Sequence, residues 1–181
     1  NPDKIDYWVE DVLADNLYSK IEAMDQLDVL VGCAGGNKPE PVSDITVETL
    51  DWMLDLNVRA IFRASQSAAK VMLSQGSGSI INMSSQMGHV GAPNRTLYCT
   101  TKHAVEGLTK ALGVELAPNG IRVNVVSPGL IDTSRATGTV VPGSDTMFNN
   151  PLQRKGTSDE IASACLYLAS DDSSYVTGQT L

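Results

Sequence analysis

Two residues of this chain have types and spacing suited to proton transfer: a tyrosine and a lysine four positions apart, Tyr98 and Lys102. In a helix, residues i and i+4 project from the same face, so both side chains would point the same way. A free phenol has a pKa of about 10, too high for an efficient base at neutral pH, and a neighbouring ammonium favours the phenolate. Lys102 can therefore bias Tyr98 toward ionisation and can also hold a hydroxyl group.

A serine thirteen residues before Tyr98 supplies a third group. Ser85 ends the apolar stretch 78–85, and its hydroxyl would donate a hydrogen bond to a substrate oxygen and polarise it. A serine at a strand end and a Tyr/Lys pair on the next helix can meet at one carbonyl oxygen, which makes a proton-transfer site for interconverting an alcohol and a ketone. The alternative is an ordinary helix surface pair and a strand-end hydroxyl, and a YxxxK tetrapeptide by itself favours that alternative.

The elements that must position these groups are indicated by hydrophobic periodicity and by glycine and proline. Apolar residues at helical spacing predict helices over 3–24, 46–74, 98–117 and 158–168. Short apolar runs predict strands over 28–32, 79–84, 121–126 and 178–181. Thr46 is a predicted N-cap, Gly76 and Gly78 end the second helix, and 157–160 reads as a capping box.

Buried strands that alternate with amphipathic helices predict an α/β fold, a doubly wound parallel sheet of Rossmann-like type, in a single domain over 1–181. Ligands of such sheets bind at the carboxyl ends of the strands. Here those ends are 32–36, 84–85 and 127–129, so all three candidate segments are expected on one rim. Residues 134–156 have no periodicity and are expected to form a loop that acts as a lid over the substrate.

Composition excludes several other classes of protein. The net charge of −8 over 181 residues argues against a nucleic-acid partner, which requires clustered Lys and Arg. No apolar run approaches the roughly 18 residues of a membrane span. Three widely spaced cysteines form neither a CxxC metal pattern nor a disulfide framework, which indicates reduced thiols and a cytoplasmic location. The two histidines offer no metal set, so no metal is expected.

With the sequence motifs in view, the chain resembles the short-chain dehydrogenase/reductase family, of the simple single-domain type. The motif after the first predicted strand, 28–35, resembles the family's strand followed by Asn-Asn-Ala-Gly. Asn57 matches its helix asparagine, and Ser85, Tyr98 and Lys102 match its catalytic residues at the expected spacing. Residues 124–133 resemble the segment that wraps the nicotinamide, and 177–181 resemble the closing strand.

This resemblance implies a role for each matching residue. Tyr98 would be the general acid/base, Ser85 would orient the substrate, and Lys102 would bind the nicotinamide ribose and lower the pKa of Tyr98. Asn57 would hold a water through a local break in its helix and complete a proton relay. The cofactor would be NAD or NADP, and its expected contacts are Ala34, Gly35, Tyr98, Lys102, Pro128, Gly129, Ile131 and Thr133. Without the resemblance, these residues would be read as turns, strand ends and a capping or surface asparagine.

The chain departs from the family pattern at two places. Gly32 and Cys33 stand where the family has two asparagines, and a thiol cannot make the hydrogen bonds of an amide on both sides. The family's glycine-rich turn is absent, and the sequence starts midway through what resembles a third βα unit. We therefore expect a partial domain, without the N-terminal βα units and the end of the last strand, in which strand 28–32 is an open edge.

The function that these expectations favour is hydride transfer between a nicotinamide cofactor and a secondary alcohol or ketone. Two alternatives stay open: a non-catalytic relative that acts as an oligomer partner or binding module, and an epimerase or dehydratase. The resemblance implies a homodimer or homotetramer paired through the helices 46–74 and 98–117, whose outer positions would include Ala64, Ala68, Ala104 and Ala111. The alternative is that these helices simply cover the sheet. The substrate, a small molecule, stays open, with Gln86, His89 and Asn94 at the pocket mouth.

Overall fold

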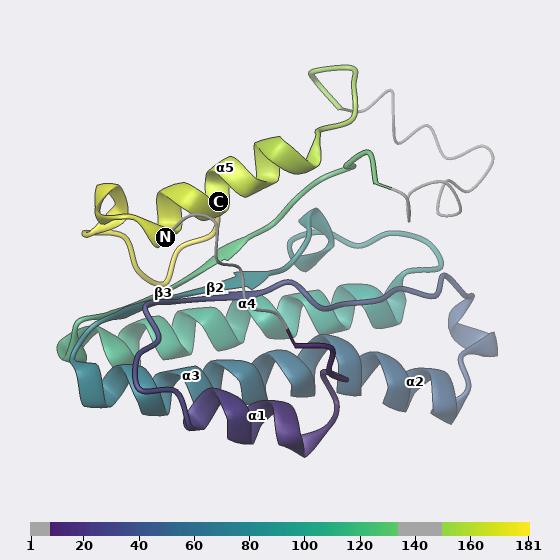
Figure 1. Ribbon diagram of the computed structural model, residues 1–181. Helices are drawn as coiled ribbons and strands as arrows, with labels where there is room; N and C mark the ends of the chain where they lie inside the picture. Colours follow the sequence, from purple (N-terminus) through teal and green to yellow (C-terminus); the bar gives the residue numbers. More distant parts are fainter. Residues whose placement is uncertain (1–7, 134–149) are drawn as a thin grey trace.

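The computed structural model describes residues 8–133 and 150–181, and a parallel sheet runs through their middle (Figure 1). The strands β1 (Val29–Gly32), β2 (Gly78–Met83) and β3 (Ile121–Val126) lie in the order β1-β2-β3. The predicted last strand also lies against β3, since Val125 N–H donates to the Gln179 carbonyl and Leu181 N–H to the Val125 carbonyl, both at 2.9 Å. Within the described residues β1 is therefore the edge of the sheet, as predicted.

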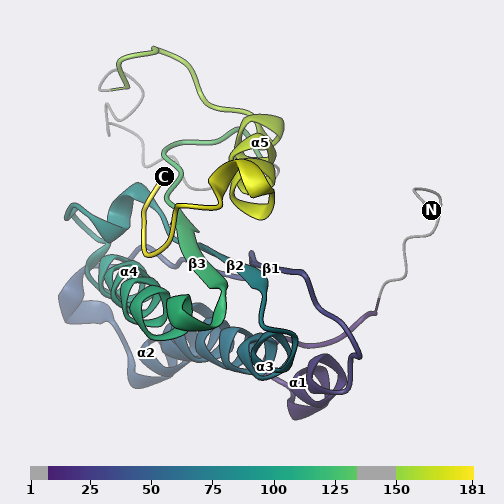
Figure 2. The ribbon, with the colours of Figure 1, turned by 90° about the vertical axis from the view of Figure 1, so that its left-hand side faces the viewer.

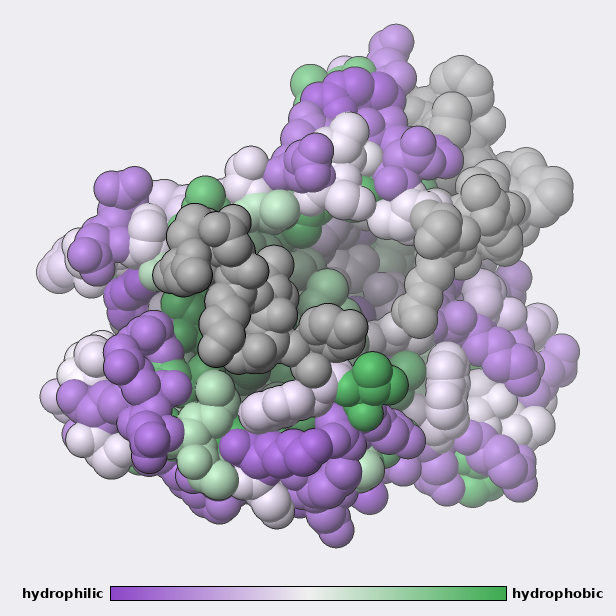
Figure 3. Space-filling view, in the orientation of Figure 1, coloured by the Kyte–Doolittle hydropathy of each residue, from purple (hydrophilic) through white to green (hydrophobic). Residues whose placement is uncertain are grey.

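Helices cover both faces of this sheet, so the doubly wound fold is confirmed. The lower layer of Figure 1 holds α1 (Asp15–Glu22), α2 (Val47–Leu54), α3 (Ala60–Gln75) and α4 (Thr96–Leu116). Among the α-helices of residues 8–133 and 150–181, α5 (Ser158–Ala169) alone lies on the opposite face, which Figure 2 shows from the side. In the space-filling view, the visible face is hollowed between the two layers (Figure 3).

The sheet is buried because alternate side chains of each strand pack on opposite faces. On one face, Ile80 and Val123 belong to a core with Met72 of α3. On the other face, Ile81 and Val126 pack with Leu168 of α5. Ala68, predicted as an outer position for oligomer contacts, is fully buried in the first core, so that part of the expectation is wrong.

The first predicted helix is shorter than expected. Residues 8–14 are not helical, and α1 begins only at Asp15; residues 1–7 lie outside the described residues. The Asp11 carboxylate accepts a hydrogen bond from the Leu13 N–H at 2.9 Å, and the Asp11 carbonyl accepts from the Ala14 N–H at 3.0 Å. An aspartate that bonds its own local backbone in this way stabilises a turn in competition with the helix.

The predicted helix 46–74 is one rod with a defect inside it. Thr46 caps it as predicted, accepting from the Thr49 N–H at 3.2 Å. Between α2 and α3, residues Asp55–Arg59 form a π-turn, in which the Ala60 N–H donates to the Asp55 carbonyl. This widened turn is the local break that the resemblance implied around Asn57, and π-turns of this kind often occur at functional sites.

One close approach between α4 and the C-terminal segment depends on a glycine. A Cβ at Gly113 would lie 2.7 Å from the backbone of Gly178, which itself has a positive φ of 70°. We expect Gly113→Ala to destabilise the fold by about 1–3 kcal/mol through overpacking. The matched control is Gly107→Ala in the same helix, where a Cβ would meet nothing within 4 Å. This change is expected to raise the free energy of unfolding by about 0.5–1 kcal/mol, because alanine favours a helix more than glycine does.

Urea denaturation of both variants and the parent chain checks this pair of expectations. The two changes are identical in chemistry and in helix, so only the packing against Gly178 separates them. Equal stability changes at the two positions would contradict the close approach.

Candidate active site

Ser85 lies where β2 ends, at the start of the short 3-10 helix Gln86–Gly88. Its hydroxyl oxygen accepts from the Met87 N–H at 3.2 Å, so the serine caps this turn. The next amide, Gln86 N–H, donates to the Pro128 carbonyl at 2.9 Å. The segment after β2 is therefore joined to the segment after β3, as expected for parallel strands that end at one rim.

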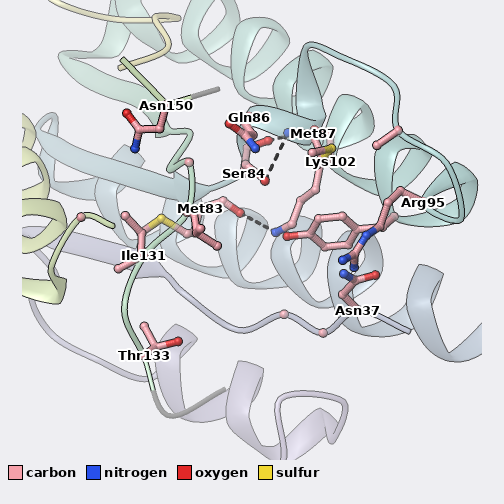
Figure 4. A pocket seen from close by; sticks show the side chains of 18 of the residues that line it. Asn37, Met83, Ser84, Gln86, Met87, Arg95, Lys102, Ile131, Thr133 and Asn150 are labelled. Atoms are coloured by element: carbon pink, nitrogen blue, oxygen red, sulfur yellow. Dashed lines mark hydrogen bonds between the residues drawn. The ribbon is translucent and has the colours of Figure 1, made fainter. Parts of the chain in front are cut away.

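Tyr98 and Lys102 lie on the first turns of α4, and the helix brings both to the same rim. The Lys102 side chain is 4% exposed, and its ammonium donates to the Met83 carbonyl at 2.9 Å (Figure 4). Its nitrogen lies 5.8 Å from the centre of the Tyr98 ring. Burial lowers the pKa of Lys102 to about 8, although Cys33 and Glu106 act in the raising direction.

The pKa of Tyr98 does not follow the expectation from sequence. Burial raises the pKa of the phenol above its ordinary value, and the hydrogen bond with Ser85 and the charge of Arg95 only partly oppose this. The Ser85–Tyr98 hydrogen bond nevertheless brings together the two groups that the sequence placed at one carbonyl oxygen.

Asn57 is fully buried at the π-turn and binds the loop that follows β1. Its amide oxygen accepts from the Gly36 N–H and its amide nitrogen donates to the Gly36 carbonyl, both at 2.8 Å. The same nitrogen also donates to the Thr101 hydroxyl at 3.1 Å. Asn57 therefore fixes the glycine loop to the helix that carries Tyr98. The water relay expected at this residue stays a prediction.

These elements border one cavity of about 1170 Å³. Of the predicted site residues, those that line it are Gly35, Ser85, Tyr98, Lys102, Gly129, Ile131 and Thr133. Figure 4 shows Ile131 and Thr133 on the side of the cavity away from Lys102. The remaining predicted residues, Ala34, Asn57 and Pro128, lie next to lining residues in the chain or bind them but do not line the cavity themselves.

A flat nicotinamide ring fits such a cavity only where the backbone leaves room. A Cβ at Gly35 would stand 3.5 Å from the Lys102 ammonium and 3.4 Å from the Asn57 amide oxygen, so glycine keeps the approach to that ammonium open. A lysine is a suitable donor to ribose hydroxyls, which are acceptors without charge. The residues present therefore fit the nicotinamide half of a cofactor.

Several lining residues were not predicted from the sequence. Trp52, Asn37 and Arg95 border the cavity, and Figure 4 shows Asn37 and Arg95 pointing toward one another. Of the three expected at the mouth, Gln86 and Asn94 line the cavity, whereas His89 does not and instead lies 3.2 Å from Glu106. No local pattern marks Trp52 or Arg95, because only the packing of α2 and of the start of α4 brings them to the rim.

The lid expected over 134–156 falls mostly on 134–149, outside the described residues. The remainder borders the cavity through residues such as Asn150 and Leu152, and Gly156, which also lines the cavity, pairs with Ile131. Its action as a lid stays a prediction.

Within residues 8–133 and 150–181, no group of His, Cys, Asp and Glu is placed to hold a metal ion. Among the helices of that same part, none is long and apolar enough to cross a membrane.

Comparison with protein families gives a match over nearly the whole chain: a family model described as Enoyl-(Acyl carrier protein) reductase matches residues 10–181. The chain is 35% identical to a 3-oxoacyl-[acyl-carrier-protein] reductase of Thermotoga maritima, over 99% of this chain and 76% of that protein. It is 41% identical to a 3alpha-hydroxysteroid dehydrogenase of Mediterraneibacter gnavus, over 88% of this chain but only 64% of that protein.

Solved structures that resemble this chain include dehydrogenases with bound cofactor, in agreement with the sequence relatives. A tyrosine-to-phenylalanine variant of ElxO with NADPH bound has a TM-score of 0.89 and 29% identity, over 97% of this chain and 75% of that chain. A protein of Beutenbergia cavernae described as an NAD(P)-dependent gluconate 5-dehydrogenase, with NADP bound at low occupancy, has a TM-score of 0.89 and 31% identity, over 96% of this chain and 72% of that chain. The chain thus spans between about two thirds and three quarters of the proteins that it matches.

Proposed function

Because this chain belongs to the short-chain dehydrogenase/reductase family, we propose that it serves an NAD- or NADP-dependent oxidoreduction of a secondary alcohol or ketone. The observation that carries the proposal is the meeting of Ser85, Tyr98 and Lys102 at one wall of one cavity. The relatives named above are a reductase and two dehydrogenases, and two similar structures hold NADP or NADPH.

The residues of the chain divide the work of the reaction. In the reducing direction, Tyr98 gives its phenolic proton to the carbonyl oxygen of the substrate, and Ser85 donates a hydrogen bond to the same oxygen. Because burial raises the pKa of Tyr98, the phenol is protonated at neutral pH and ready to act as the acid. A bound nicotinamide cofactor supplies the hydride.

Lys102 and Asn57 prepare this site. Lys102 is positioned to bind the nicotinamide ribose, and its charge stabilises the phenolate that remains on Tyr98 after proton donation. Asn57 holds the Gly36 backbone and so keeps the loop after β1 open for the cofactor. Gly129, Ile131 and Thr133 form the opposite wall, against which the ring would pack.

The side of the cavity that belongs to the substrate mixes polar and apolar groups. Arg95 and Asn37 line the cavity together with Trp52 and Met87, which favours a substrate with both a polar part and an apolar part. The homodimer or homotetramer, the cytoplasmic location and the absence of nucleic-acid and membrane partners remain predictions from the sequence.

The test measures the change in nicotinamide absorbance when the chain is mixed with NAD, NADP or their reduced forms and a panel of alcohols and ketones. Turnover of at least one pair, which requires both cofactor and substrate, supports the proposal. Cofactor binding without turnover of any pair would instead favour a non-catalytic binding module.

A further inference from the structure

A carboxylate that the proposed reaction does not use is buried beneath the site. Glu106 follows Lys102 by one turn of α4 and is only 4% exposed. Burying a carboxylate costs free energy of folding unless hydrogen-bond donors surround it. The groups that face Glu106 therefore indicate its role.

Donors from separate segments converge on the two oxygens of Glu106. The Ser127 hydroxyl, just after β3, donates to one oxygen at 2.6 Å, and the Thr180 hydroxyl of the C-terminal segment donates to the other at 2.6 Å. His89, which follows the turn after β2, lies 3.2 Å from the first oxygen. The Glu106 side chain thus joins α4 to three segments: the end of β3, the C-terminal segment and the turn after β2.

These contacts reach Ser85 through the backbone. Ser127 precedes Pro128, whose carbonyl accepts from the amide of Gln86, the neighbour of Ser85. The turn also packs tightly on Glu106, since a Cβ at Gly88 would lie 3.1 Å from its side chain. A shift of Glu106 would therefore shift the segment that presents Ser85.

Glu106 also acts on the site by charge. Burial raises its pKa, but the hydrogen bonds from Ser127 and Thr180 and the charge of His89 outweigh burial and hold the pKa below its ordinary value. The carboxylate is therefore ionised at neutral pH, and it acts to raise the pKa of Lys102, against the effect of burial.

We propose that Glu106 is a positioning residue for the reaction proposed above: it holds the Ser85 segment against the end of β3 and keeps a negative charge one helical turn from Lys102. The inference rests on the proposed function only in its second half. The titratable groups that face the two residues are His89 at Glu106, and Cys33 and Glu106 at Lys102, with the Tyr98 ring beside the ammonium.

The experiment compares Glu106→Gln with Glu115→Gln in the full chain. Glu115 is an exposed residue of the same helix, so it matches the substitution without the contacts. Hydrogen exchange of the amides of 84–89 and 178–181 measures the positioning, and the pH profile of kcat/KM measures the charge.

For Glu106→Gln we expect exchange in both segments to accelerate roughly tenfold or more, since hydrogen bonds to a charged group are lost. We also expect the alkaline decline of kcat/KM to move to lower pH, because Lys102 loses its proton more easily once the neighbouring charge is gone. A shift of one pKa unit changes the active fraction by up to about tenfold. Glu115→Gln should match the parent in both measurements.

Unchanged exchange in Glu106→Gln overturns the positioning, and an unchanged profile overturns the role of the charge. If the parent chain turns over nothing, the proposed function fails, while exchange still decides the positioning. If Glu106→Gln does not fold, Thr180→Val replaces it: this variant keeps the charge and removes one donor. Faster exchange at 178–181 with an unshifted profile then supports the proposal, and parental exchange overturns it.

Discussion

Tyr98→Phe is expected to lower kcat by about 10²–10⁴-fold, the range of general acid–base catalysis. The substitution removes only the phenolic oxygen, and with it the proton that the substrate oxygen receives in the proposed reaction. The ring itself stays half-buried in the wall of the cavity, so cofactor affinity should change little. Steady-state kinetics and a fluorescence titration of the cofactor measure the two quantities separately.

The control for this variant is Tyr175→Phe, which removes the same atom from a fully exposed ring. Parental kcat is expected there. If Tyr98→Phe turned over substrate at the parental rate, Tyr98 would not be the acid. The roles proposed for Ser85 and Lys102 at the same wall of the cavity would then be withdrawn as well. Loss of cofactor binding together with turnover would point to a collapsed cavity instead.

Lys102→Met is expected to lower kcat/KM by at least about 10²-fold and at the same time to stabilise the fold at neutral pH. The pKa of Lys102 falls from 10.5 to about 8 on folding, which at 1.36 kcal/mol per unit means a cost of roughly 3 kcal/mol for the buried charge. The Met83 carbonyl loses its donor, at a cost of roughly 1–2 kcal/mol. The free energy of unfolding of Lys102→Met at neutral pH is therefore expected to exceed that of the parent by about 1–2 kcal/mol.

The pH dependence of this gain has a definite sign. A lysine whose folded pKa lies below its unfolded pKa binds fewer protons in the folded state between those two values, so the stability of the parent rises as pH increases from about 8 to 10.5. Lys102→Met has no such rise, so its advantage in stability should shrink over that interval and then change sign, because the roughly 3 kcal/mol that the parent regains exceeds the net gain. Denaturation at several pH values measures it.

The matched control is Lys110→Met, an exposed lysine of the same helix, for which neither the activity nor the pH dependence of stability should change appreciably. A Lys102→Met chain less stable than its parent at neutral pH would show that the ammonium is stabilised by its surroundings rather than merely tolerated for its chemistry.

Much of the fold was predictable because its signals are local. Strand β3 was expected over 121–126 and is observed there. A short run rich in β-branched residues between Gly120 and Pro128 favours a strand, because Gly and Pro end regular structure on both sides. The caps at Thr46 and Thr157 are observed as predicted, because a side-chain oxygen and an amide three residues later are enough to form them. The start of α1 was misjudged where the side chain of Asp11 competed with the helix.

The sequence by itself determined that Tyr98 and Lys102 share a helix face, since helical geometry depends only on their spacing. It also predicted that Ser85 and Gly129 follow the ends of two parallel strands and so lie on one rim of the sheet. Only the tertiary structure decided that the pKa of Tyr98 is raised, that Asn57 is hydrogen-bonded to the Gly36 backbone and that Glu106 is buried. These depend on which distant segments exclude water and supply hydrogen-bond partners, and no local pattern of residues carries that information.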